Sequence, residues 1–557
     1  MIRREHVSRR KEEEEDIDIP LLTKMSQADS STQSSDRRRA KQQHVIVMVL
    51  GDIGRSPRMQ YHTLSLLEDG HFVTLIGYAG ENLILPLEMA LDQSTTANIN
   101  TEVDKPAYYG HLHVLRMSPY QLPKTFPLYR LLYYPFRLLS LSYCVIYTLW
   151  IELANVLPHT KNIPASAILV QNPPSMPTLL LAYMYCVWQG IWNKQRPRMV
   201  IDWHNLGYTM FEQPESTDPN RRWVVKQTIR KLAEWYERRM APLADAHLTV
   251  TQAMEIWLGE NFHVHGKNVR VLYDKPPVMF RPTSPEEQHE LFSRLKLDDG
   301  RLIVKSDSIQ DDNGGGLGSI LSSLVKRNNE QIIDETIFTQ SVRENGGKKI
   351  YRLRRDRPAL VVSSTSWTAD EDFSILLIAL RNLHKKIEAM TSDERTTFPK
   401  MLVIVTGKGP QKAYYEPLLK EFNNTHNIIN IQTLWLEAND YPTLLGCATL
   451  GISLHTSTSG LDLPMKVLDF FGCEVPVCAI GFHCLDELVQ DGVNGNIFTH
   501  GEGLSTLLLD LLRNYNSYDN DGAPKNDKLE LYRNNIRGMT RWKENWEECA
   551  RNIILGE

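Results

Sequence analysis

Apolar runs of strand length recur along the chain, and each is followed by a stretch long enough to form a helix. The first run spans 44–50 and ends at Gly51, 57–67 has the length of a helix, and 72–76 is the next apolar run. A strand, a glycine turn, a helix and a second strand are the beginning of a right-handed parallel α/β unit. Further runs of strand length continue this first set at 168–170, 199–201 and 246–250.

A second set of apolar runs begins at residue 359, after a stretch without this rhythm. Its runs lie at 359–362, 401–405, 428–431 and 450–454. The sequence therefore predicts an α/β protein with two doubly wound, Rossmann-like domains, at 44–290 and 358–520. In sheets of this kind, ligands bind at the carboxyl ends of the strands.

Three segments fall outside these two domains. Residues 1–43 are charged and polar, with neither a signal peptide nor a start-anchor helix, and predict a disordered tail. Residues 300–357 form a linker, in which 306–349 is rich in Asp, Asn, Gly and Ser and predicts a flexible insertion without chemistry. Residues 521–557 predict a charged C-terminal helix that crosses back to brace the first domain.

A segment of the first domain, about 126–157, combines an apolar core with aromatic and basic flanks. The core is shorter than the roughly 20 residues of a membrane-spanning helix and ends at Glu152. Tyrosine, tryptophan and arginine flanks favour a helix in the headgroup region of a membrane, and the apolar run 179–192 could lie beside it. The alternative is that both runs are packing helices buried in the domain.

Composition narrows the class of protein. The 557 residues carry a net charge of −5 with no basic cluster, which gives no reason to expect nucleic acid as a partner. The seven cysteines have irregular spacing and mostly lie in apolar runs. We therefore expect reduced thiols in a cytosol-facing protein, and no metal site.

Three loops of the second domain predict a site for a diphosphate. Gly460 precedes a helix that starts at Pro464, and Lys466 lies in its first turn, where free N–H groups favour an anion. The Gly-Lys-Gly string 407–409 and the Ser-Thr-Ser string 364–366 follow two other strands. Each loop on its own could be an ordinary surface turn instead of a phosphate-binding loop. The three loops together indicate phosphate binding.

Six strings stand in a characteristic order along the chain. They are Gly-Asp-Ile-Gly-Arg-Ser at 51–56, Gln-Asn-Pro-Pro at 171–174, Ile-Asp-Trp-His-Asn at 201–205, Ser-Ser-Thr-Ser-Trp-Thr at 363–368, Thr-Gly-Lys-Gly-Pro at 406–410 and Ser-Gly-Leu-Asp-Leu-Pro-Met-Lys at 459–466. In this order, and over roughly residues 44–280 and 358–500, the chain resembles the chitobiosyldiphosphodolichol β-mannosyltransferase family, which adds the first mannose to the dolichol-linked oligosaccharide.

The resemblance implies the glycosyltransferase-B fold, in which both sets of strand ends face one cleft, with the acceptor in the first domain and the nucleotide sugar in the second. It implies GDP-mannose as donor, chitobiosyl-diphosphodolichol as acceptor and no tightly bound cofactor, with metal stimulation left open. It places the site on the cytosolic face of the endoplasmic reticulum membrane, with other dolichol-pathway mannosyltransferases as candidate partners. In one departure, family members often begin with a membrane-spanning helix, whereas residues 1–43 here are polar.

Three residues of the first domain are candidates for the general base that takes the acceptor's proton. Asp52 stands at a strand end, although it can equally cap the helix that starts near Pro57. Asp202 and His204 follow another strand, and a histidine titrates near neutrality. The sequence does not decide among the three.

The turn around Asp52 is also expected to hold the acceptor's diphosphate. Helix N–H groups and a guanidinium both bind phosphate well. The candidate residues are Gly51, Gly54, Arg55 and Arg58.

The donor site is expected on the second domain. Asp462 and Asp469 are seven residues apart, so they could share a helix face, and Asp469 could bind the donor ribose or pair within the helix. Retaining relatives of this fold carry a glutamate pair in this region, and its positions fall on Ser459 and Val467, which agrees with an inverting mechanism. The donor-side candidates are Ser364, Thr365, Ser366, Gly407, Lys408, Gly409, His455, Ser459, Gly460, Asp462, Lys466 and Asp469.

Two other functions remain open at this stage. One is a related transferase with a different donor or polyprenyl acceptor. The other is a catalytically silent, membrane-associated scaffold for neighbouring glycosyltransferases. Intact phosphate loops argue against a silent scaffold, which has no use for them.

Overall fold

The computed structural model describes residues 42–91, 106–120, 129–211, 221–266, 268–295, 331–343, 348–368, 371–437, 439–457, 459–515 and 527–557. The predicted tail lies almost wholly outside these residues, as does the part of the predicted insertion before residue 331. The described chain from His44 onward forms one compact unit.

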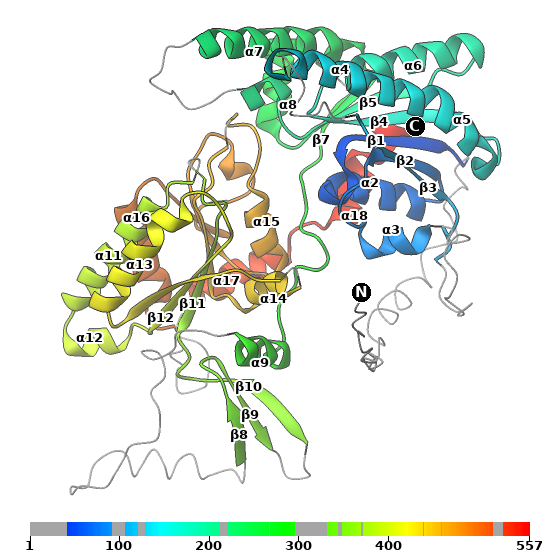
Figure 1. Ribbon diagram of the computed structural model, residues 1–557. Helices are drawn as coiled ribbons and strands as arrows, with labels where there is room; N and C mark the ends of the chain where they lie inside the picture. Colours follow the sequence, from blue (N-terminus) through cyan, green and yellow to red (C-terminus); the bar gives the residue numbers. More distant parts are fainter. Residues whose placement is uncertain are drawn as a thin grey trace, which may run out of the picture. The chain divides into compact units, whose positions relative to one another are not determined.

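The first domain is built on a seven-stranded sheet in which all neighbouring strands are parallel (Figure 1). Its strand order, β3-β2-β1-β4-β5-β6-β7, reverses direction between β1 and β4. A reversal of this kind leaves a crevice at the carboxyl ends of the two strands beside it. The strands are β1 (His44–Asp52), β2 (Phe72–Tyr78), β3 (Leu112–Met117), β4 (Ala165–Asn172), β5 (Arg198–Trp203), β6 (Ala246–Thr249) and β7 (Val269–Val271).

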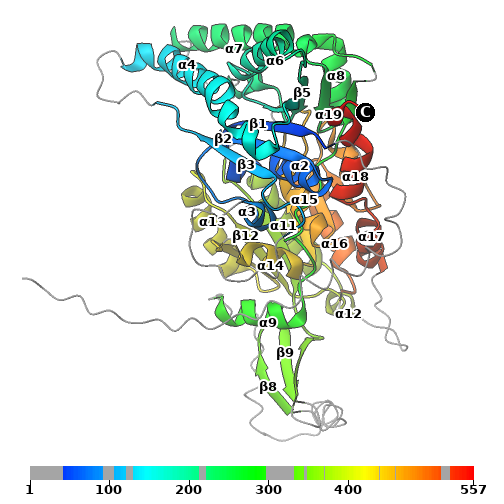
Figure 2. The same cartoon turned by 90° about the vertical axis from the view of Figure 1, so that its right-hand side faces the viewer.

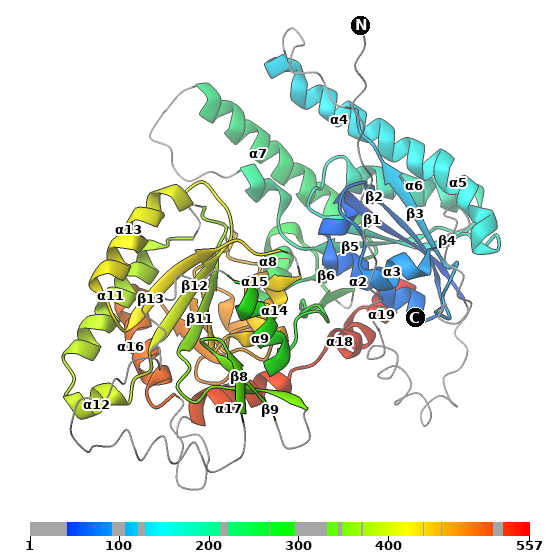
Figure 3. The same cartoon turned by 60° about the horizontal axis from the view of Figure 1, so that its bottom comes forward.

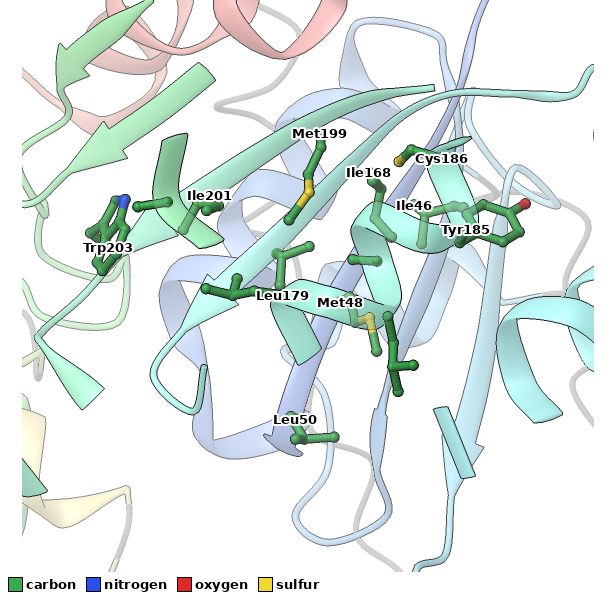
Figure 4. Close-up of a cluster of buried hydrophobic side chains, with 14 of the residues drawn as sticks. Ile46, Met48, Leu50, Ile168, Leu179, Tyr185, Cys186, Met199, Ile201 and Trp203 are labelled. Carbon is green, nitrogen blue, oxygen red and sulfur yellow. The ribbon is translucent and has the colours of Figure 1, made fainter. Parts of the chain in front are cut away.

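Both faces of this sheet are buried, because successive side chains of a strand point to opposite faces. On β1, Ile46 and Met48 belong to one core, shown in Figure 4, while Val45 and Val47 belong to the core on the other face. Helices cover each face, which explains why the strands read as unbroken apolar runs. The helices of this domain are α2 (Pro57–Glu68), α3 (Leu85–Ala90), α4 (Tyr129–Tyr147), the short π-helix η2 (Thr148–Glu152), α5 (Leu153–Val156), α6 (Thr178–Trp192), α7 (Arg221–Met240) and α8 (Gln252–Phe262).

The second domain repeats the plan with a six-stranded sheet, ordered β13-β12-β11-β14-β15-β16. The strands are β11 (Ala359–Ser364), β12 (Met401–Thr406), β13 (Ile429–Leu434), β14 (Leu450–Ser453), β15 (Val477–Ile480) and β16 (Gly495–Phe498). Two cores again lie on opposite faces, with Val361 in one and Leu360 in the other. The helices are α11 (Ser374–Glu388), α12 (Ser392–Thr396), α13 (Lys412–Thr425), α14 (Asp440–Cys447), α15 (Met465–Gly472) and α16 (Gly501–Leu512).

The segment between the domains is more ordered than expected. Within the predicted flexible insertion, β8 (Gln331–Glu335), β9 (Thr339–Arg343) and β10 (Lys349–Leu353) form an antiparallel sheet, visible at the bottom of Figure 1. Helix α9 (Pro285–Arg294) packs on this sheet through Phe292, whose ring lies 4.4 Å from that of Phe338. The expectation of a wholly flexible insertion is therefore wrong for its described part, because apolar side chains of the sheet have a helix to pack against.

The C-terminal segment forms three helices where the sequence predicted one, and the last two return to the first domain. It contains α17 (Asp527–Arg537), α18 (Trp542–Cys549) and α19 (Arg551–Leu555), and α18 lies beside α2 in Figures 1 and 3. The indole N–H of Trp546 donates to Nδ1 of His62 at 3.0 Å, and that of Trp542 donates to Ser65 at 2.9 Å. Trp546 is 2% exposed and belongs to the core between α2 and the sheet.

The carboxyl ends of the two sheets meet. The Asn205 amide, just beyond β5, donates to Oδ1 of Asp462 at 3.2 Å. The Thr251 hydroxyl, just beyond β6, donates to the carbonyl of Leu461 at 2.6 Å. The predicted fold class is confirmed: two doubly wound, Rossmann-like domains with their strand ends on a shared cleft, the glycosyltransferase-B fold.

Candidate active site

A buried ion pair organises the first-domain side of the cleft. Asp202, near the end of β5, is 0% exposed, and its two oxygens each accept an N–H from Arg58 at 2.8 Å. Arg58 also donates to Asp274 at 2.8 Å and to the carbonyl of Leu272 at 2.7 Å. Burial by itself would raise the pKa of Asp202, but Arg58 and the adjacent His204 hold that pKa well below its usual range. Asp202 is therefore a carboxylate at any physiological pH.

His204, directly after β5, is the part of this cluster that solvent reaches most. Its side chain is 24% exposed, and its Nε2 lies 2.9 Å from Oδ2 of Asp202. A carboxylate can only accept, so Nε2 of His204 carries a proton, and in the neutral imidazole Nδ1 then carries the lone pair. On the buried side, Nε2 of His62 lies 3.3 Å from the same oxygen, and burial lowers the pKa of His62. Asp202 thus fixes the tautomer of the exposed histidine.

The Asp52 carboxylate is hydrogen-bonded to backbone N–H groups. Its carboxylate accepts the N–H of Gly54 at 3.0 Å and that of Glu81 at 3.1 Å, and its Oδ2 lies 3.5 Å from Nε of Arg55. Asp52 does cap a helix, but it is the short η1 (Ile53–Arg55) and not the expected helix at Pro57, whose N-cap is Ser56. Its side chain stays 22% exposed.

The expected acceptor residues divide by burial. Gly51 is the last residue but one of β1, and Gly54 is needed for packing, because a Cβ there would lie 2.5 Å from the carbonyl oxygen of Glu81. The Arg55 side chain is 72% exposed and paired with Glu81. Arg58 is 4% exposed, and its donors are used by Asp202, Asp274 and a carbonyl. This burial corrects the expectation that Arg58 binds the acceptor, because its guanidinium is paired with Asp202 and Asp274 inside the domain.

On the second-domain side, the predicted loops converge on a carboxylate. Glu371 is 2% exposed and accepts from the Thr365 hydroxyl, from the Ser366 N–H at 2.6 Å and from Nζ of Lys466. Nδ1 of His455 lies 3.8 Å from it. Lys466 also donates to the Ser366 hydroxyl at 3.2 Å and is itself 26% exposed. Lysine, hydroxyls and the start of α15 therefore come together as the sequence predicted, with an acidic residue at their centre that the prediction lacked.

The Gly-Lys-Gly loop packs directly on this cluster. Gly407 has a φ of +119°, and a Cβ there would lie 1.8 Å from the carbonyl oxygen of Thr365. A Cβ at Gly409 would lie 1.9 Å from the carbonyl oxygen of Ser366. Glycine is required because two backbones touch. Nζ of Lys408 lies 3.6 Å from the ring centroid of Trp435, an indole that is 60% exposed just after β13.

Asp462 and Asp469 do not share a helix face, contrary to expectation. Helix α15 begins at Met465, so Asp462 lies in the preceding turn, where Gly460 has a φ of +71°. Asp462 accepts from the hydroxyls of Ser457 and Ser459 and from Asn205 of the first domain. The residue joins the two domains through this set of hydrogen bonds.

Asp469 sits one turn inside α15 at the end of a polar chain. The Tyr441 hydroxyl lies 3.0 Å from that of Ser364 and 3.5 Å from Oδ2 of Asp469. Burial raises the pKa of Asp469 to about 7, against the opposing effects of Tyr441 and Lys466. Near neutral pH this carboxyl can either donate or accept a hydrogen bond, which suits contact with sugar hydroxyls.

No family model matches the chain. A human chitobiosyldiphosphodolichol β-mannosyltransferase is 36% identical over 524 residues, covering 93% of this chain and 94% of the human one. The chain belongs to the chitobiosyldiphosphodolichol β-mannosyltransferase family. A Dictyostelium discoideum enzyme of the same name is 34% identical over 521 residues, covering 90% of this chain and 92% of its own. This β-mannosyltransferase family member is also 37% identical over 524 residues to an Arabidopsis thaliana protein named UDP-glycosyltransferase TURAN, covering 92% and 97% of the two chains.

Solved structures resemble the chain more distantly. A glycosyltransferase from Rickettsia africae has a TM-score of 0.47 at 10% identity, with 91% of this chain and 97% of the other covered. Anabaena HepE in complex with UDP and glucose has a TM-score of 0.45 at 13% identity, with 92% and 97% covered. At these scores the fold is established by the strand order and not by these likenesses.

Several residues of the candidate site escaped prediction from the sequence. Glu371 was missed because an acidic residue argues against a phosphate loop, and its single signal is its place in a hydroxyl-rich segment. Tyr441 lies on α14, far from the other site residues in sequence. His62 and Asp274 complete the Asp202 cluster across long sequence separations.

Within the described residues, no group of three or more His, Cys, Asp or Glu side chains is arranged to hold a metal ion.

Proposed function

We propose that the protein transfers mannose from GDP-mannose to the terminal GlcNAc of chitobiosyl-diphosphodolichol, forming a β-1,4 linkage with inversion. The observation that carries this proposal is the 36% identity to a human enzyme of that name over nearly the whole of both chains. The name supplies the acceptor and the β-mannosyl product. The donor nucleotide, the inverting step and a site on the cytosolic face of the endoplasmic reticulum are our own extension.

His204 is our choice as general base, with Asp202 as the residue that orients it. The acceptor hydroxyl oxygen attacks C1 of the mannose from the side opposite the phosphate, the bond from C1 to the diphosphate oxygen breaks, and GDP leaves. The hydroxyl proton passes to Nδ1 of His204, whose Nε2–H is held by Asp202 at 2.9 Å. One displacement turns an α-linked donor into a β-linked product.

Asp52 is the weaker candidate for this role. Its carboxylate already accepts two backbone N–H groups and caps η1, so its hydrogen-bonding capacity is used within the first domain. Asp202 is weaker still, because it is wholly buried and paired with Arg58.

Lys466 and Ser366 are proposed to bind the leaving diphosphate at the N-terminus of α15. A full charge and free helix N–H groups both favour the negative charge that develops on the leaving oxygen. Glu371 is proposed as a positioning residue, since its ion pair fixes the direction of the Lys466 side chain. Asp469 and Tyr441 would contact the donor's hydroxyls. The exposed indole of Trp435 would stack on the guanine ring of GDP.

The nucleotide is tested by comparing GDP with UDP, since one relative carries UDP in its name. Thermal unfolding of the purified protein is followed with increasing GDP, UDP or GDP-mannose. The proposal predicts stabilisation by GDP and GDP-mannose at concentrations where UDP has little effect. Preference for UDP would overturn the donor assignment, and no response to any nucleotide would favour a silent scaffold.

A further inference from the structure

The outer side of α4 and η2 carries an exposed apolar stripe. Leu139, Tyr143 and Ile146 are 69%, 67% and 44% exposed, and they recur at helical spacing. The opposite side of the same segment is buried: Val145 and Leu149 are 0% and 1% exposed and belong to the core of the first domain. The segment is therefore apolar on both sides, and the protein covers only the inner one.

Helix α6 repeats the arrangement. Its outer residues Leu180, Met184 and Ile191 are 38%, 50% and 70% exposed, while Leu179 and Tyr185 are buried in the same core. The two helices touch through Trp150, whose ring centroid lies 5.4 Å from that of Tyr185 and 6.1 Å from that of Trp188. In Figures 1 and 2, α4 and α6 lie together over one face of the sheet.

Helix α7 adds positive charge to this face. The hydroxyl of its Tyr236 accepts the N–H of Leu180 at 3.0 Å, so α7 adjoins α6. Its outer side presents Leu232 and Trp235, at 54% and 56% exposure. The cations Lys231, Arg238 and Arg239 are exposed on the same turns.

Acidic side chains near this face are already engaged. The Glu152 carboxylate accepts the Thr148 hydroxyl at 2.9 Å, and that of Glu234 lies 3.8 Å from Arg230. Exposed Leu, Ile, Trp and Tyr beside Lys and Arg are the composition of helices that lie in the headgroup region of anionic membranes. We infer that the outer sides of α4, η2, α6 and α7 form one docking face for an anionic lipid surface, with the helices lying in its plane.

The packing of the segment from α4 to α5 indicates that it lies in the plane of the membrane and does not cross it. The segment Pro135–Val156 has 22 residues and is long and apolar enough to span a bilayer. Its inner residues Val145, Leu149, Leu153 and Val156, however, are at most 4% exposed and fill the core against the sheet. A spanning helix would remove these side chains from that core.

The docking face lies close to the cleft. On the inner side of α7, Oε1 of Glu237 accepts the N–H of Gly207 at 2.9 Å and the Asn172 amide at 3.1 Å. Gly207 is three residues beyond His204, so one helix separates the lipid surface from the proposed base. If the proposed function holds, a dolichol-linked diphosphate at the membrane surface is within reach of the cleft. The docking face itself does not depend on that function.

The test is flotation of the purified full-length chain with vesicles of phosphatidylcholine, with or without phosphatidylserine. Leu139→Glu with Ile191→Glu places two charges on the apolar stripes and is expected to lower the vesicle-bound fraction about tenfold or more. Lys231→Glu with Arg239→Glu is expected to abolish the preference for phosphatidylserine while residual binding to phosphatidylcholine remains. Leu531→Glu, at a position 54% exposed on α17, is the matched control and should float like the unchanged protein.

Two further readouts keep the outcome decisive. Unchanged melting temperature and GDP-dependent stabilisation show that the variants are folded, because none of these residues lies in the donor site. Equal flotation of all variants would overturn the docking face. If Leu139→Glu with Ile191→Glu instead dissolves a dimer seen by light scattering and leaves flotation unchanged, the face binds a second copy of the chain and the proposal is wrong. Transfer to a water-soluble acceptor tests the proposed function separately.

Discussion

Nε2 of His204 lies 2.9 Å from the carboxylate of Asp202, which is itself wholly buried and doubly hydrogen-bonded to Arg58. The arrangement sets the histidine tautomer and directs the basic nitrogen away from the protein interior. A buried charge, a partly exposed imidazole and a fixed orientation between them suit a general base.

His204→Ala is expected to lower kcat by about a hundredfold or more, because general-base catalysis typically contributes factors of that size. Binding of GDP should be unchanged, since His204 lies on the first domain. Steady-state kinetics and calorimetric titration with GDP check both statements. Asp52→Asn is the matched comparison: if it abolishes turnover while His204→Ala retains it, Asp52 is the base.

Asp202→Asn is expected to destabilise the protein by about 3–5 kcal/mol, because it leaves the buried Arg58 guanidinium with Asp274 as its one remaining charged partner among the described residues. Adding Arg58→Met should recover part of this loss while turnover stays low. Urea unfolding measures the stability, and the transfer assay measures turnover. Recovery of full turnover in the double variant would show that Asp202 serves the fold alone.

Lys466→Ala is expected to weaken GDP binding by about tenfold or more without unfolding the protein, because it removes a full charge from the proposed diphosphate site. Glu371→Gln should have the opposite effect on binding. It removes the charge that neutralises Lys466, so GDP binds more tightly while kcat falls as the lysine loses its fixed direction. Calorimetry and kinetics separate the two effects. Unchanged values in both variants would remove this pair from the donor site.

Asp469 gives the free protein a pH-dependent stability. Burial raises the pKa of this carboxyl to about 7, above the value near 3.8 expected when unfolded. Between about pH 4 and 7 the folded state binds more protons than the unfolded state, so stability from this group falls as pH rises. Asp469→Asn has no charge to bury and should therefore gain stability relative to the unchanged protein as pH rises from 5 to 8. Melting temperatures at several pH values test this, and a difference independent of pH would contradict it.

Much of the fold was predictable because both sheets are parallel and covered on each face. A strand such as β1 then reads as a continuous apolar run ended by a turn, and this signal is local. The ordered sheet β8–β10 was not predictable in this way, because its strands are short and polar and depend on α9 for a core. The returning helix α18 was expected, but its Trp546 to His62 hydrogen bond joins residues far apart in sequence.

The candidate site was predictable only where its residues share a loop or a strand end. Lys466, Ser366 and His204 could be named as candidates because each follows a strand of a doubly wound sheet. Their partners were not, because Glu371 and Arg58 act through contacts that only folding creates. Arg58 was instead predicted to bind phosphate, because it is a basic residue near the start of a helix. Its burial, which the sequence does not show, argues against that role.

The central claim is tested most directly by mannose transfer to a defined acceptor. Purified protein is incubated with GDP-mannose labelled in the sugar and with a chitobiosyl-diphosphate polyprenyl acceptor, and the lipid product is digested with β-mannosidase. We predict lipid-soluble label that β-mannosidase releases and α-mannosidase does not. Label released only by α-mannosidase would contradict inversion, and no transfer by a protein that still binds GDP would contradict the proposed acceptor.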